Sequence, residues 1–256
     1  MTYERIISLT PSITETLFAL GVGDHVVGVT DACDYPPEAN TKSHVCSWFA
    51  PDMGCITALE PDLVLGLSTA HQRLALLLKS RNIKLVLFNP VTVDHALSDM
   101  ISLGTLLGII ETAELLVQEL KHRMQKLAGK VKQVKPEERL TVSRVLDIEG
   151  ENLIVAGPKS FQYDVIKKAG GKNVTTAINE AYPTVSFQSL KTWNPDMIFL
   201  CGTDQSYISR LQTDLLWQSL AAIQNGKIYL FDCGLTCRTG PRIVDMAELL
   251  FETLYT

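Results

Sequence analysis

The sequence lacks a long apolar run and a cluster of positive charge. No window of the 256 residues is apolar enough to cross a bilayer, and the opening MTYERIISLTPSITE has no basic segment followed by an apolar one. The net charge is −5, whereas binding of nucleic acid needs a clustered basic surface. We therefore expect a soluble chain that carries no secretory signal and has no nucleic-acid partner.

The sequence also lacks the common catalytic motifs. It contains no nucleophile elbow, no Walker loop and no His-x-x-x-His pair. The segment GVGDHVVG spaces its glycines somewhat like a dinucleotide fingerprint, but it follows a predicted helix and opens a predicted strand, which is the reverse of the required order. Because no acid–base pair or nucleophile is recognisable either, we predict that the chain is not an enzyme.

Cysteine is present but in no diagnostic spacing. An apolar fraction of 46% suffices for a core in a chain of this length, so disulfide staples are not required. Cys201, in MIFLCG, is expected to be a small buried residue. Cys33, Cys46 and Cys237 lie in loop-rich segments, where they are either candidate metal ligands or incidental thiols.

Strand-like and helical patterns alternate in both halves of the chain, which predicts parallel strands joined by helical crossovers. Between the halves, apolar residues recur at spacings of three and four on one long helix that ends before Pro136. The predicted fold class is α/β, with two Rossmann-like lobes joined by one rigid helix. The predicted boundaries are 1–108 for the first lobe, 109–135 for the helix and 136–256 for the second lobe.

The first helix has an explicit start signal. Pro11 precedes Ser12, which is a candidate N-cap residue, and Glu15 follows three positions later as in a capping box. Such a start presents free backbone N–H groups at the carboxyl end of a strand, and ligands of open α/β sheets collect at that edge. We therefore count Pro11 and Ser12 among the candidate binding residues.

Aromatic residues are few, at 7% of the chain, and several of them lie in predicted loops. Two prolines hold Tyr35 on a stiff segment, DYPPEA. Trp48 in SWFAP and Tyr182 in EAYPTVS also occupy turn-rich segments, and Arg238 could supply one charge beside them. Each of these residues alone could equally pack against the core to hold its loop in place. Together they favour a binding site for a large flat ligand.

A weak internal repeat supports the two-lobe plan. The segments ALEPDLVLG and TWNPDMIFLCG both place Pro-Asp directly before an apolar strand. The repeat indicates either that each lobe follows one βαβ plan or that both lobes share a common helix-to-strand turn.

Taken together, these segments resemble the class III periplasmic substrate-binding proteins of ABC importers. The resemblance rests on RIISLTPSITETLFALGVGDHVVGVTDACDYPPEA, LEPDLVLG, AGPKSFQYDVIKKAGG, NPDMIFL and RTGPRIVD. It is strongest to the vitamin B12-binding members and spans nearly the whole chain. It implies two Rossmann-like lobes, a shallow ligand cleft between them, a periplasmic or extracellular location and no catalysis, and we expect a monomer.

The resemblance also implies roles for single residues. Tyr35 matches the aromatic of the family's Asp-Tyr-Pro-Pro loop, Trp48 the tryptophan of a Ser-Thr-Trp segment, and Arg238 the arginine of the last cleft loop. Tyr182 stands where the B12 binders have a tryptophan. After the first Pro-Asp strand the B12 binders have another cleft tryptophan, where this chain departs from the pattern with Leu67, Ser68 and Thr69. The implied ligand is cobalamin, with haem or an iron siderophore as the alternative.

Two departures from the family pattern concern the importer. The B12 binders dock onto their permease through one glutamate on each lobe, and this chain has Gly54 and Gln188 at those positions. Loss of both carboxylates would weaken such docking. The alternative interpretation is therefore an intracellular metal-handling or sensor protein that uses Cys33, Cys46 and Cys237.

Overall fold

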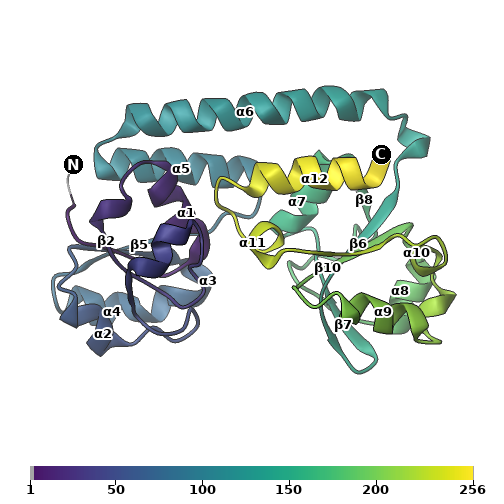
Figure 1. Cartoon of the computed structure of the whole chain (residues 1–256), viewed down its shortest axis with the longest axis horizontal. Coiled ribbons are helices and arrows are strands. Elements are labelled where there is room, and N and C mark those ends of the chain that lie inside the picture. Colours follow the sequence, from purple (N-terminus) through teal and green to yellow (C-terminus); the bar gives the residue numbers. More distant parts are fainter. Residues whose placement is uncertain (1–2, 256) are drawn as a thin grey trace. The chain divides into compact units, whose positions relative to one another are not determined.

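The computed structural model describes residues 3–255, which form two compact units that each contain a separate sheet (Figure 1). Unit 1 consists of the chain up to Pro90, of Asp94–His122 and of the short segment Arg238–Pro241. Unit 2 consists of Val91–Val93, Arg123–Cys237 and the chain from Arg242 onward. The predicted α/β class with two lobes is confirmed.

Unit 1 is built on a fully parallel five-stranded sheet in the order β3-β2-β1-β4-β5. The central strands β1 and β4 consist almost entirely of buried apolar residues, as expected of a parallel sheet that is covered on both faces. The strands are β1 Ile6–Ser8, β2 Val26–Val29, β3 Ser43–His44, β4 Leu63–Leu67 and β5 Lys84–Phe88.

Short helices connect these strands and enclose the core of unit 1. One apolar cluster gathers around Leu17 and Leu65, and a second gathers around Ile7 and Leu78, so apolar packing covers both faces of the sheet. The helices are α1 Pro11–Ala19, α2 Met53–Ala58, α3 Ser68–His71 and α4 Ala75–Lys79.

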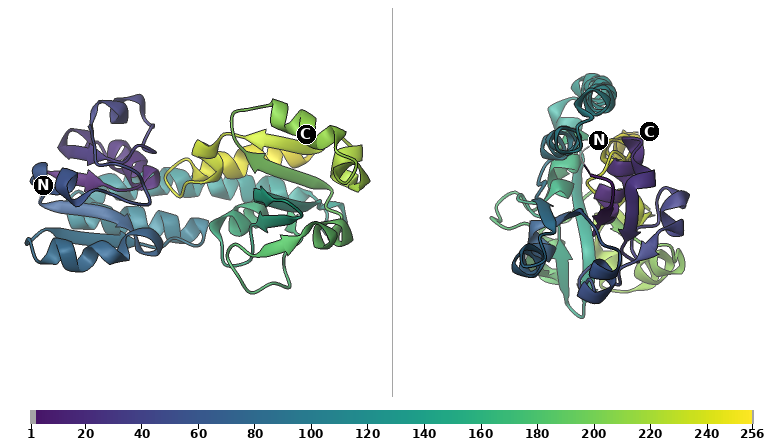
Figure 2. Two further views of the ribbon diagram at one scale, coloured as in Figure 1. Left: turned by 90° about the horizontal axis from the view of Figure 1, so that it is seen from below. Right: turned by 90° about the vertical axis from the view of Figure 1, so that its left-hand side faces the viewer.

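Two long helices, α5 Val93–Leu107 and α6 Ile110–Gln133, follow β5. The predicted break falls at Gly108, whose φ of 74° favours glycine. Where α6 begins, it runs beside α5, and Figure 2 shows the two helices end-on and next to each other. A Cβ at Gly104 would lie 2.3 Å from the Cβ of Ala113, so this close approach requires a glycine. The predicted apolar stripe of α6 is confirmed, since Ala113, Val117, Leu120, Leu127 and Val131 are buried.

Unit 2 is built on a mixed six-stranded sheet in the order β11-β10-β6-β7-β9, with β8 paired to β6. The strands β6, β8, β10 and β11 are parallel, but β7 is antiparallel to both β6 and β9. The expectation of parallel strands is wrong here because only two residues separate β6 from β7, which is enough for a hairpin but not for a crossover. The strands are β6 Thr141–Glu149, β7 Asn152–Val155, β8 Lys172–Asn173, β9 Thr184–Ser186, β10 Met197–Cys201 and β11 Ile228–Phe231.

The helices of unit 2 include the C-terminal α12, which Figure 1 draws alongside the second half of α6. Arg123 of α6 forms ion pairs with Asp245 and Glu248 on one face of α12. The helices are α7 Phe161–Lys168, α8 Phe187–Trp193, α9 Ser206–Thr213, α10 Ala221–Gln224, α11 Cys233–Thr236 and α12 Ile243–Tyr255. None of the helices within residues 3–255 is long and apolar enough to cross a membrane.

The Pro-Asp repeat has a structural counterpart in each unit. Asp62 accepts hydrogen bonds from the backbone N–H groups of Glu4 and Arg5, just before β1. Asp196 accepts them from the backbone N–H and the hydroxyl of Thr141, the first residue of β6. The carboxylate just before β4 thus fixes the start of its parallel neighbour β1, and the carboxylate just before β10 fixes the start of its parallel neighbour β6. The residues before the two prolines, Glu60 and Asn194, also share a φ of 44°.

Candidate ligand-binding site

Four parallel strands of unit 1 direct candidate residues to one edge of the sheet. Pro11 and Ser12 follow β1, Tyr35 lies in the loop after β2, Trp48 lies in the loop after β3, and Ser68 follows β4 directly. Since these strands are parallel and adjacent, their carboxyl ends meet at the same edge. The structure therefore brings all the candidates of the first lobe to the edge that the sequence predicted.

The first helix begins two residues earlier than the capping-box prediction. Its N-cap residue is Thr10, with Pro11 as the first helical residue, and the cap makes no side-chain hydrogen bond. The fixed φ of proline suits this first position, so Ser12 already lies inside the helix. The hydroxyl of Ser12 lies 2.9 Å from that of Thr10, and Glu15 pairs with Arg238 instead of completing a capping box.

The loop that carries Tyr35 is anchored at several points. The Cys33 thiol before it is buried and hydrogen-bonded by the hydroxyls of Thr14 and Thr30. Asp34 forms an ion pair with Arg238 at 2.7 Å. The Tyr35 side chain is 42% exposed. The tyrosine thus presents an aromatic surface to solvent from an immobilised backbone.

Arg238 anchors this loop instead of offering an unpaired charge to a ligand. Its guanidinium donates to Glu15 Oε1 at 2.9 Å and to the backbone oxygen of Ala32 at 3.2 Å, in addition to its pair with Asp34. The prediction that Arg238 supplies the one charge beside the ligand stays a prediction, and in this structure that charge is already paired within unit 1. Glu15 is almost fully buried, and a buried carboxylate requires a paired cation.

The segment SWFAP exposes Phe49 more than Trp48. Phe49 is 69% exposed, whereas Trp48 is half-buried, with its ring 4.1 Å from that of Phe49 and edge-on to His71. The backbone N–H of Leu67 donates to His71 Nδ1, so the other ring nitrogen, Nε2, donates to the Trp48 carbonyl at 2.9 Å. Burial lowers the pKa of His71, which keeps the ring neutral in this position. Phe49, which the sequence places beside Trp48 in the same loop, is thus the more exposed aromatic of this segment and a further candidate contact.

A small cavity lies beside α1 within unit 1. It holds about 20 Å³ and is lined by residues that include Ser12, Thr16 and Asp99. That volume suits one water molecule and is far below the few hundred Å³ of a ligand pocket. Burial raises the pKa of Asp99 to about 6, and its Oδ2 has no hydrogen-bond partner within the described part of the chain.

In unit 2, Tyr182 lies just before β9. The antiparallel pairing of β7 with β9 places this segment beside the carboxyl end of β7, and the N–H of Gly157 donates to the carbonyl of Ala181. The Tyr182 hydroxyl donates to Gln162 Oε1 at 3.1 Å, and the residue remains 45% exposed. Burial of the hydroxyl end raises the pKa of Tyr182. Tyr182 is therefore a positioned, partly exposed aromatic, like Tyr35. Phe161, another aromatic residue of this unit, is the first residue of α7 and is buried.

The predicted metal ligands Cys33, Cys46 and Cys237 do not form a group. Cys33 belongs to the apolar core of unit 1, where burial raises the pKa of its thiol. The Cys46 sulfur lies 4.0 Å from that of Cys55. Cys237 belongs to unit 2. The loop positions of these cysteines did not indicate which strand ends would bring them together.

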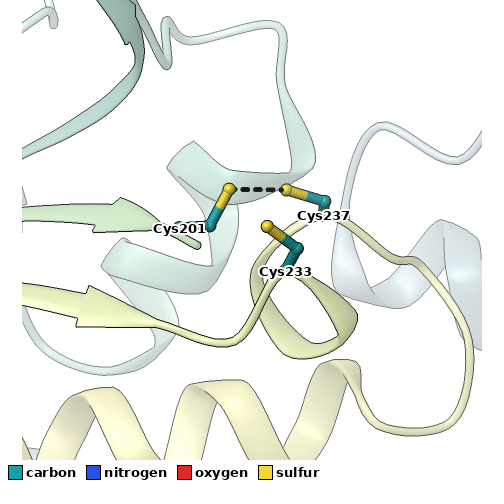
Figure 3. A group of neighbouring side chains, drawn as sticks. All are labelled: Cys201, Cys233 and Cys237. Carbon is teal, nitrogen blue, oxygen red and sulfur yellow. Dashed lines mark hydrogen bonds between the residues drawn. The ribbon is translucent and has the colours of Figure 1, made fainter. Parts of the chain in front are cut away.

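A different set of cysteines converges in unit 2. The sulfur atoms of Cys201, Cys233 and Cys237 all lie within 4.8 Å of one another, and they are the one such group of potential metal ligands found in residues 3–255 (Figure 3). A hydrogen bond with Cys237 lowers the pKa of the Cys201 thiol to about 5, and the same interaction raises the pKa of Cys237. The expectation that Cys201 is a buried apolar residue is wrong, because it is the last residue of β10 and turns toward α11.

Gly54 and Gln188, the positions where the resemblance implies docking glutamates, lie at equivalent points of the two units. Gly54 is the second residue of α2 and Gln188 is the second residue of α8, and both are exposed. Each helix directly precedes the strand, β4 or β10, that follows a Pro-Asp pair. Neither position carries a charge.

Comparison with known proteins assigns the chain to a family. Residues 6–233 match the family described as periplasmic binding protein. A vitamin B12-binding protein of Yersinia pestis is 28% identical over 252 residues, which cover 98% of this chain and 86% of the relative. The similarity thus spans both units.

Solved structures show the same fold. A "possible" iron-binding (periplasmic solute-binding) protein from Staphylococcus epidermidis is 27% identical, with a TM-score of 0.84 and full coverage of both chains. A periplasmic haem-binding protein from Roseiflexus gives a TM-score of 0.89 at 22% identity, with 98% of each chain covered. The second likeness shows the fold alone.

Proposed function

The chain belongs to the periplasmic binding protein family, and on that premise we propose that it binds a corrinoid, namely cobalamin. The family is non-enzymatic, which confirms the prediction that the chain is not an enzyme; its members bind small-molecule solutes and couple to ABC permeases. We propose that the ligand contacts Pro11, Ser12, Tyr35, Trp48 and Ser68, which lie at one edge of the sheet of unit 1; Tyr182 stays a candidate contact.

The observation that carries this proposal is the presentation of Tyr35. A rigid aromatic side chain loses little conformational entropy when it packs against a large planar ligand, so a fixed loop favours affinity. Tyr35 combines an exposed ring with a loop that Arg238 and Asp34 hold in place. The vitamin B12-binding relative at 28% identity supports a corrinoid as the large ligand.

Arg238 has a supporting role in this proposal. Because its guanidinium is already paired with Glu15 and Asp34, it contributes by positioning the loop and not as a free counter-charge. The proposed contacts are thus mainly aromatic and apolar, which suits the neutral faces of a macrocycle better than a small anionic solute.

The experiment is a calorimetric titration of Tyr35→Ala with cyanocobalamin. We expect its affinity to fall at least about tenfold, or about 1.4 kcal/mol, because an aromatic contact is lost. Tyr3→Ala is the matched control, since Tyr3 precedes β1 at the opposite edge of the same sheet. An unchanged affinity in Tyr35→Ala would overturn the placement of the site.

The second candidate ligand is an iron compound, either haem or a ferric siderophore. The relative described as a possible iron-binding protein favours it. Parallel titrations with haemin and with a ferric siderophore separate the two candidates. Submicromolar binding of either one, with no binding of cobalamin, would replace the corrinoid proposal.

Handover to an importer would have to proceed without carboxylates at Gly54 and Gln188. Gly54 and Gln188 leave both equivalent helix starts uncharged. If the partner permease presents arginines at these places, Gly54→Glu combined with Gln188→Glu will speed its association at low salt.

A further inference from the structure

Three thiols of unit 2 come from positions that the fold fixes. Cys201 ends β10, and β11 is its parallel neighbour. Cys233 begins α11 two residues after β11, and Cys237 follows four positions later, so both lie on one face of a helical turn. Figure 3 shows all three sulfur atoms turned toward a common point. The group is therefore set by two adjacent strand ends and one turn of helix.

A buried cation adjoins this group. Arg144 of β6 is only 1% exposed, and its guanidinium donates to the Cys237 sulfur at 3.6 Å. The guanidinium also donates to the carbonyl of Val145, and the Arg144 Nε has no partner within residues 3–255. Arg144 forms no ion pair with a carboxylate in this part of the chain, and a buried charge without a counter-charge is costly. Negative charge on the neighbouring sulfurs would compensate for it.

The spacing of the sulfurs fits a single metal ion. A tetrahedral zinc site with Zn–S bonds of about 2.3 Å places its sulfurs about 3.8 Å apart. In this protein the sulfurs of Cys201 and Cys237 are 3.4 Å apart, and all three pairs lie within 4.8 Å. Side-chain adjustments of at most about 1 Å would bring each pair to the tetrahedral distance.

We propose that Cys201, Cys233 and Cys237 form a three-thiolate site for a soft, closed-shell metal ion such as Zn(II), with a fourth position open to solvent. Cys233 and Cys237 are exposed, which leaves one side of the group accessible. The inference does not depend on the proposed function, because all its residues belong to unit 2 and none is a proposed contact of the corrinoid.

The donor atoms select the ion. Thiolates favour Zn(II), Cd(II) and Cu(I), whereas Mg(II) and Ca(II) require oxygen ligands. Three thiolates and one divalent ion carry a net charge of −1, which the Arg144 guanidinium neutralises. Each sulfur that still bears a proton releases it to solvent as its metal bond forms, so affinity rises with pH.

The test is a titration of the reduced, full-length protein with Co(II) under anaerobic conditions, followed by displacement with Zn(II). We expect one equivalent of Co(II) to produce the thiolate-to-metal charge-transfer absorption and the intense visible bands of a tetrahedral site. Cys233→Ser and Cys201→Ser should weaken binding more than about 100-fold, which exceeds the usual effect of losing an outer-shell partner. Cys46→Ser is the matched control, because it removes an exposed thiol from unit 1.

Alkylation of the wild-type protein provides a test that needs no variant. With iodoacetamide, one equivalent of Zn(II) should protect Cys201, Cys233 and Cys237, while Cys46 and Cys55 react at an unchanged rate; peptide mass spectrometry distinguishes them. The absence of a tetrahedral thiolate spectrum would overturn the proposal. So would an equal effect of Cys46→Ser, or protection that does not follow the three cysteines.

Discussion

The guanidinium Nη1 of Arg238 lies 2.9 Å from the Oε1 of Glu15, although 223 positions separate the two residues in the chain. Glu15 is 2% exposed and Arg238 is 10% exposed, so the pair is withdrawn from solvent within unit 1. The same guanidinium reaches Asp34 and therefore fixes the loop of Tyr35.

Removal of this arginine should destabilise the protein strongly. Arg238→Met leaves the Glu15 carboxylate buried without the guanidinium that pairs with it, so we expect the free energy of unfolding to fall by about 3–5 kcal/mol. Urea unfolding followed by circular dichroism measures the loss. The double variant with Glu15→Gln should recover part of it, and a loss of less than about 1 kcal/mol in the single variant would contradict this account.

Asp99 predicts a dependence of stability on pH. Burial raises its pKa from 3.8 to about 6, so the folded state holds the proton more tightly than the unfolded state. Its stabilising contribution is complete below about pH 4 and is lost as the pH rises through 6. Asp99→Asn should therefore raise the melting temperature at pH 7 and leave it nearly unchanged at pH 4. A lower melting temperature at pH 7 would show that the carboxylate has a stabilising partner.

Replacing Trp48 should lower both ligand affinity and stability, whereas replacing Phe49 should lower mainly affinity. Phe49→Ala removes an exposed ring, so it should lower cobalamin affinity severalfold with little effect on stability. Trp48→Ala should lower affinity at least tenfold and also cost stability, because the ring packs against Phe49 and His71. Calorimetry measures the affinity of each variant, and thermal unfolding measures its stability. Equal losses of stability in the two variants would contradict this prediction.

The two Pro-Asp carboxylates should contribute unequally. Asp196 is partly buried and accepts two hydrogen bonds at 2.7 Å, so Asp196→Ala should cost about 2 kcal/mol of stability. Asp62 is exposed, and Asp62→Ala should cost less. Urea unfolding of the two variants under the same conditions compares them, and a larger loss at Asp62 would be the contrary result.

Much of the fold could be predicted from the sequence because its signals are local. The period of the apolar residues indicated the long helix α6, and Gly108 marked where α5 ends. The β6–β7 hairpin did not follow from the same pattern, because apolar runs show where strands lie but not how they pair. The start of α1 was misplaced by two residues, since proline at the first helical position competes with serine as a start signal.

The candidate site could be predicted only where strand order decides it. Tyr35, Trp48 and Ser68 follow β2, β3 and β4, parallel strands of one sheet, so their shared edge follows from the topology. The partners of Arg238 could not be foreseen, because Glu15 and Asp34 are far from it in the sequence. The cysteine group was missed for a related reason: the spacing of Cys233 and Cys237 was visible, but the approach of Cys201 depends on β10 pairing with β11.

The most direct test of the proposed function is a titration of the purified wild-type chain with cyanocobalamin and with hydroxocobalamin. Calorimetry and visible absorbance monitor the binding during the titration. We predict one-to-one binding of both forms with a dissociation constant below about 1 μM, or more than about 8 kcal/mol of binding free energy. Absence of binding of either form, under conditions in which the protein is folded, would contradict the proposal.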